Sequence, residues 1–115
     1  MTMNQTPLFD PKKTADVVDA ERVVLYALGD FQARGLALAG RDLPLDRLRG
    51  ALRRAAEAFG VEELEDEEAA ATLGSLGANV RRVPAFFAKH PFRVVVHEEL
   101  AERARLFLQE TKDAS

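Results

Sequence analysis

The sequence predicts a single α+β domain, in which a small antiparallel sheet of about three strands is packed by three to four helices. Three stretches carry this prediction. Apolar residues recur at helical spacing over 45–59 and over 98–110, and they alternate with other residues over 92–97. The alternating stretch decides the class, because one strand is unstable alone and requires partner strands elsewhere in the chain. An all-α bundle is the alternative architecture.

The two ends of the chain are predicted to lie outside the packed domain. Residues 1–13 predict an extended arm, because two prolines interrupt a mostly polar stretch. Leu8 and Phe9 are the side chains through which this arm would dock. The domain itself is predicted over 14–110, and the polar residues 111–115 are predicted to form a frayed tail.

Two structures compete for the N-terminal third of the domain. The residues from Val23 to Tyr26 are β-branched and aromatic, and the glycine and aspartate at 29–30 are typical of a turn. We therefore predict strands over 22–28 and 33–39, the first of which is the expected partner of the C-terminal strand. The alternative is one long helix from 14 to about 34, because the large apolar residues also fall on one helical face.

Three later segments have the periodicity of amphipathic helices. The first spans 45–59, between Pro44 and Gly60, and a glycine at this place is a typical helix stop. The second, over 66–76, begins inside a block of glutamate and aspartate that suits the positive end of a helix dipole. The third, over 98–110, opens with two glutamates for the same reason.

The composition excludes several kinds of function. The chain has no cysteine, which excludes disulfides, thiolate zinc sites and cysteine nucleophiles and is typical of the reducing cytoplasm. No apolar run approaches the roughly 20 residues of a spanning helix, and the N-terminus lacks the pattern of a secretion signal. We expect a soluble cytoplasmic protein with no membrane partner. Its net charge of -3 provides no overall attraction to nucleic acid, so that such a contact needs a local basic patch.

Side chains for catalysis or metal binding are few and badly spaced. His90 and His97 are the two histidines, and an extended strand would separate them by roughly 20 Å, too far for one shared metal ion. Ser75 and Ser115 are the two serines, and neither lies in a nucleophile elbow. No phosphate-binding glycine loop occurs. We therefore predict a non-enzymatic protein with no catalytic residue, metal site, cofactor or small-molecule substrate.

One glycine pattern resembles a known nucleic-acid-binding loop. The stretch Leu73-Gly74-Ser75-Leu76-Gly77, with apolar residues following at 80 and 83, resembles the Gly-x-x-Gly loop by which KH domains clamp single-stranded nucleic acid. It differs from that loop at Leu76, where a basic or small residue would suit a phosphate. The competing interpretation is a helix end that leads into a core-facing segment.

The strongest candidate for function is the basic aromatic segment, residues 79–97. It contains four cations and no carboxylate, together with three phenylalanines and both histidines. Aromatic residues and arginine are enriched at the centres of protein interfaces. The residues expected to bind a partner are Arg81, Arg82, Phe86, Phe87, Lys89 and His90.

These residues predict an interaction or regulatory module that self-associates, as a homodimer or larger homo-oligomer, or that binds an acidic protein partner. The alternative is a protein that binds single-stranded nucleic acid, with the cations on phosphates and the phenylalanines on bases. In that alternative, Arg47, Arg49 and Arg54 would extend the basic patch. A helix-turn-helix contact with DNA is disfavoured, because the acidic residues 62–68 begin the element that would enter the groove.

Overall fold

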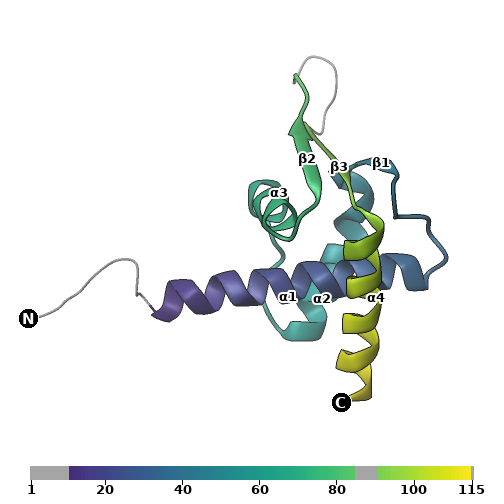
Figure 1. The fold of residues 1–115 in the computed structure, drawn as a ribbon. Coiled ribbons are helices and arrows are strands. Elements are labelled where there is room, and N and C mark those ends of the chain that lie inside the picture. Colours follow the sequence, from purple (N-terminus) through teal and green to yellow (C-terminus); the bar gives the residue numbers. More distant parts are fainter. Residues whose placement is uncertain (1–10, 85–90, 115) are drawn as a thin grey trace, which may run out of the picture.

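The computed structural model describes residues 11–84 and 91–114, with side chains from Asp19 onward. The described chain forms four α helices, a short 3-10 helix and a three-stranded antiparallel sheet (Figure 1). In chain order these are α1 (Pro11–Ala33), β1 (Asp42–Pro44), the 3-10 helix η2 (Leu45–Leu48), α2 (Arg49–Phe59), α3 (Asp66–Ser75), β2 (Asn79–Arg82), β3 (Phe92–Val95) and α4 (Glu98–Asp113). The predicted α+β class is confirmed.

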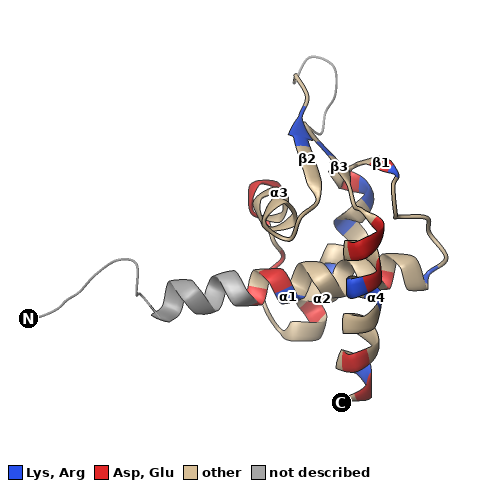
Figure 2. Cartoon of the chain, in the orientation of Figure 1, with Lys and Arg blue, Asp and Glu red and all other residues tan. Residues whose placement is uncertain are grey.

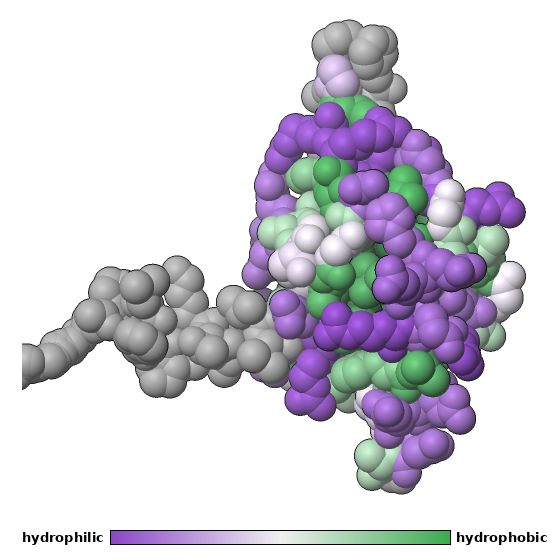
Figure 3. Space-filling model, in the orientation of Figure 1, coloured by the Kyte–Doolittle hydropathy of each residue, from purple (hydrophilic) through white to green (hydrophobic). Residues whose placement is uncertain are grey.

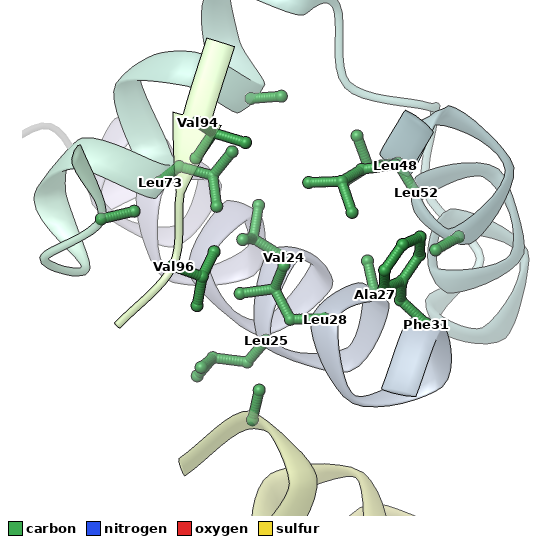
Figure 4. Packing of buried hydrophobic residues seen from close by; sticks show 14 of the residues in the cluster. Val24, Leu25, Ala27, Leu28, Phe31, Leu48, Leu52, Leu73, Val94 and Val96 are labelled. Carbon is green, nitrogen blue, oxygen red and sulfur yellow. The ribbon is translucent and has the colours of Figure 1, made fainter. Parts of the chain in front are cut away.

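The N-terminal region is helical, and the two strands predicted over 22–28 and 33–39 are wrong. α1 matches the alternative of one long helix. Its residues Val24, Leu28 and Phe31 follow one another at helical spacing, and each is at most 2% exposed within the core (Figure 4). Burying this stripe stabilises the helix by more than the modest β preference of valine opposes it.

Gly29 lies inside α1 and does not form a turn. A Cβ atom on Gly29 would stand 2.6 Å from the backbone oxygen of Ala104 and 2.7 Å from the Cβ atom of Leu108, both in α4. These distances are far below van der Waals contact, so that a residue without a side chain is needed where the two helices cross. The glycine whose pattern predicts a turn therefore marks the crossing of α1 and α4.

The sheet has the order β1-β3-β2, and β3 is antiparallel to both neighbours. β3 is the strand predicted over 92–97, and a bridge from Ala39 to Val96 continues its pairing. Its partners are β1 and β2 and not the predicted segment 22–28. β1 has three residues and ends in a proline, and β2 is mostly exposed, so neither has the apolar alternation that predicts a strand. The sheet also excludes the all-α alternative.

The two faces of the sheet have different surroundings. Val94 of β3 is 1% exposed and belongs to the same apolar cluster as Leu73 of α3 and Val24 of α1 (Figure 4). Residues next to it in β3 point to the opposite face. We call that side the open sheet face, because its residues are exposed or half-buried: Asp42, Asn79, Arg81, Arg93 and Val95.

α1 is the element on which the other helices pack, and a buried carboxylate fixes one of these contacts. Asp30 of α1 is 8% exposed. It accepts a hydrogen bond from Arg54 Nε of α2 at 2.8 Å and another from Arg34 Nε at 3.1 Å. A carboxylate at this depth requires such partners, so the pair with Arg54 determines how α2 lies against α1.

The three later helices lie at their predicted positions. α2 follows the 3-10 turn and ends at Gly60, whose φ of 67° is in the left-handed region that favours glycine. α3 covers the predicted 66–76 segment to within a residue. α4 extends to Asp113, three residues beyond its predicted end. α1 begins at Pro11, and the first ten residues of the predicted arm lie outside the described residues.

Candidate interaction surface

Two of the six residues predicted to bind a partner lie in the described structure, at the end of β2. Arg81 and Arg82 are the last two residues of β2. The other four predicted residues lie outside the described part of the chain: Phe86, Phe87, Lys89 and His90. The described part of the site therefore consists of β2 and β3, which project from the helices in Figure 1.

Arg81 and Arg93 are paired across β2 and β3, and they share the carboxylate of Asp42 from β1. Arg81 Nη2 is 2.6 Å from Asp42 Oδ2, and Arg93 Nε is 3.0 Å from Asp42 Oδ1. Arg93 Nη2 also donates to the backbone oxygen of Asp42 at 3.0 Å. The hydrogen bonds from Arg93 and then Arg81 hold the pKa of the Asp42 carboxyl below its ordinary value of 3.8.

The cluster indicates that a carboxylate is the chemical group that fits two arginines at this spacing. One carboxylate bridges both guanidinium groups, so that the cluster keeps a net positive charge. The side chain of Arg81 is 57% exposed, and a further carboxylate can reach it from solvent. The hollow beside the cluster measures about 320 Å³ and is lined by Asn79, Val80, Arg81, Arg93 and Val95.

Asp42 is the residue of this arginine cluster that the sequence did not reveal. It lies more than thirty residues before β2, and it meets the two arginines only because Asp42 pairs with Val95 across β1 and β3. β1 itself has no sequence signal, and therefore the register that brings Asp42 to the open sheet face has none either.

Arg82 lies next to α3. Its Nη2 atom is 2.7 Å from Glu67 Oε2, and its guanidinium carbon stands 4.5 Å from the centre of the Phe92 ring. Phe92 is only 7% exposed and belongs to the core. This burial argues against stacking of the Phe92 ring on a base, which the nucleic-acid alternative would use, since the ring is covered by the protein.

The arginines of α2 are mostly engaged within the chain. Arg49 donates to Glu63 Oε2 at 2.9 Å and also pairs with Asp66, which ties the α2–α3 connection to the start of α2. Arg54 is bound to the buried carboxylate of α1. Arg47 is the residue of the predicted basic extension for which no ion pair is found among the described residues. The extension therefore provides much less free positive charge than its sequence predicts.

The Gly-x-x-Gly stretch ends α3 and leads directly into β2. The backbone N–H of Ala78 donates to Leu73 O at 3.0 Å, and that of Leu76 donates to Thr72 O at 3.0 Å. Gly77 follows with a φ of 107°. These are the contacts of a helix end, which is the competing interpretation of the stretch. The structure therefore favours a helix end over a nucleic-acid-binding loop at this stretch.

The order of the elements bears on DNA binding. Two consecutive helices, α2 and α3, precede the strands β2 and β3. In a helix-turn-helix the second helix, here α3, enters the major groove. The first turn of α3 contains Asp66, Glu67 and Glu68, and Figure 2 shows acidic residues on this helix in red. The Glu67 side chain is 73% exposed. These carboxylates repel phosphates, which disfavours that mode of DNA binding.

Other kinds of site find little support. Within the part of the chain that the structure describes, no group of three or more acidic or histidine side chains is placed to hold a metal ion. His97 is exposed at the start of α4. Among the described helices, none is both long enough and apolar enough to cross a bilayer.

Comparisons with known proteins give no assignment. The chain matches no protein-family model, and no curated protein or solved structure is significantly similar to it.

Proposed function

We propose that this protein is a non-enzymatic interaction module that self-associates through the basic aromatic segment. The observation that carries the proposal is the arginine cluster on the open sheet face, where two guanidinium groups share one carboxylate and Arg81 stays largely exposed. The sequence adds Phe86 and Phe87 between the two strands that carry this cluster. Exposed arginine beside aromatic residues is the composition of interface centres.

A second copy of the chain is the partner that the charges favour. The chain contains 19 aspartates and glutamates, and none of them lies between residues 79 and 97. Carboxylates therefore outnumber lysines and arginines over the rest of the chain, so that the rest of another copy attracts the basic aromatic segment by its net charge. Opposite charges on two surfaces speed their encounter and select the orientation in which they dock.

Mass measurement by light scattering tests self-association. We expect the parent chain to exceed its monomer mass of 12.7 kDa at low ionic strength and to approach that mass as salt screens the charges. The Phe87→Ala variant is expected to remain monomeric. Leu36→Ala is the matched control, since Leu36 is 40% exposed outside the segment. A parent chain that stays at 12.7 kDa at every concentration and salt level contradicts the proposal.

Binding of single-stranded nucleic acid through the same residues remains the alternative. The exposed side chains of Arg81 and Arg82 favour it, whereas the burial of Phe92 removes one stacking ring. A labelled oligonucleotide should then be retained at low ionic strength, and the Arg81→Ala, Arg82→Ala double variant should lose it. An oligonucleotide that is not retained by the parent chain excludes this alternative.

A further inference from the structure

A groove of about 980 Å³ runs between α1 and α4. Its apolar lining comes from Leu25, Leu106 and Phe107, and Leu106 is 46% exposed although it is a large aliphatic residue. Figure 3 shows apolar surface framed by hydrophilic surface along α4. Because ligand pockets measure about 300–1,000 Å³, the groove has room for several side chains of a partner.

The rim of this groove is acidic. Five glutamates line it against two arginines, and these glutamates are Glu21, Glu98, Glu99, Glu102 and Glu110. Glu102 pairs with Arg105, while the described residues provide no ion pair for the other four. Two grooves placed face to face would bring these carboxylates together and repel each other. The groove therefore suits an occupant that is apolar and cationic.

The chain itself contains a segment with these properties. Residues 84–91 include Phe86, Phe87 and Lys89 and no carboxylate. β2 and β3, between which this segment lies in sequence, lead away from α4 in Figure 1. Figure 2 shows basic residues on these strands and acidic residues along α4. The described strands β2 and β3 thus extend away from α4 and its groove, which favours the groove of a different copy as the one that receives the segment.

We propose that the α1–α4 groove of one copy binds residues 84–91 of a second copy, with the two phenylalanines on the apolar lining and Lys89 at the acidic rim. The inference rests on the proposed self-association and adds the surface that receives the segment. If each copy donates its segment and accepts that of its partner, the contact closes as a two-fold dimer.

Sedimentation velocity on matched variants tests this assignment. The groove variant carries Leu106→Ser and Glu110→Lys, and the control variant carries Leu36→Ser and Glu62→Lys. Both change the same residue types and raise the net charge equally, and all four residues are exposed, so that the core stays intact. We expect the groove variant to raise the dissociation constant of the parent at least about tenfold and the control to change it less than about twofold.

Two further chains identify the occupant and separate this inference from the proposed function. The Phe86→Ala, Phe87→Ala variant should dissociate like the groove variant, and a chain that lacks residues 1–10 should associate like the parent. If the phenylalanine variant dissociates while the groove variant behaves like the control, the groove assignment is wrong and self-association through the segment stands. If the shortened chain dissociates and the phenylalanine variant does not, the occupant is the N-terminus and this inference fails. A monomeric parent overturns both proposals.

Discussion

Asp42 holds together three strands that are distant in sequence. Its carboxylate accepts hydrogen bonds from Arg81 and Arg93, and both arginines belong to the basic aromatic segment. The cluster lies at the surface, where a single ion pair contributes little to stability. Its importance is geometric, because it orients two guanidinium groups side by side on the open sheet face.

A pH titration at this residue gives the first prediction. Because the pKa of Asp42 is below 3.8 in the folded chain, its ionised form stabilises the fold at pH values above 3.8, and this contribution disappears as the pH falls through the folded pKa. The stability difference between the parent and Asp42→Asn, measured by urea unfolding, should therefore be present near neutral pH and vanish in strong acid.

NMR titration of the Asp42 carboxyl group identifies the cause of the shift. Arg93→Gln and Arg81→Gln should each raise its pKa, because the hydrogen bonds from Arg93 and Arg81 both favour the ionised carboxylate. A carboxyl group that titrates at its ordinary value in the parent chain would show that the arginine cluster does not form in solution.

Gly29 determines structure at the scale of whole elements. The close approach of its position to Ala104 and Leu108 sets the distance between α1 and α4, and these two helices form the groove. An ordinary glycine inside a helix weakens it, because glycine loses more backbone entropy on folding than alanine does. At this crossing, the close packing of α1 and α4 that glycine permits stabilises the fold by more than this loss of backbone entropy costs.

Two glycine substitutions separate these effects. Gly29→Ala should destabilise the protein by about 1–3 kcal/mol, because its methyl group would overlap the backbone of α4. Gly74→Ala is the matched control in α3, where no neighbouring atom lies within 4 Å of the added Cβ, and it should stabilise by about 0.5–1 kcal/mol. Chemical unfolding measures both values. Equal stabilisation by the two substitutions would mean that α1 and α4 do not cross at Gly29.

The elements differ in how well sequence reasoning predicts them, and burial explains the difference. α2, β3 and α4 were predictable because each has one buried face, which leaves a regular apolar pattern in the sequence. α1 is buried on several sides, so its run from Val23 to Leu28 looks equally like a strand. β1 and β2 are short, and they form through pairing with β3 more than through any pattern of their own.

The candidate site divides in the same way. Arg81 and Arg82 are visible in the sequence as cations beside aromatic residues. Their partners Asp42 and Glu67 are not visible, because they approach only through the sheet register and the position of α3. The groove between α1 and α4 is equally hidden, since it depends on a helix crossing made by distant residues.

At the scale of the whole molecule, the chain separates its charges. Basic residues gather on β2 and β3, and acidic residues line the groove beside α4 (Figure 2). A net charge of -3 conceals this separation. The two surfaces belong to one chain and point in different directions. The basic surface of one copy can therefore bind the acidic surface of another copy, which is the physical basis of the proposed self-association.

Disulfide trapping tests the central claim most directly, because the chain contains no cysteine of its own. A chain with Phe87→Cys is mixed with a chain that carries Leu106→Cys, or with a control chain that carries Leu36→Cys, under mild oxidation. We expect rapid formation of the cross-linked heterodimer with the Leu106→Cys chain and slow formation with the control, since a disulfide requires its two Cα atoms to lie within about 7 Å. Equal yields from the two mixtures would contradict docking of the basic aromatic segment in the α1–α4 groove.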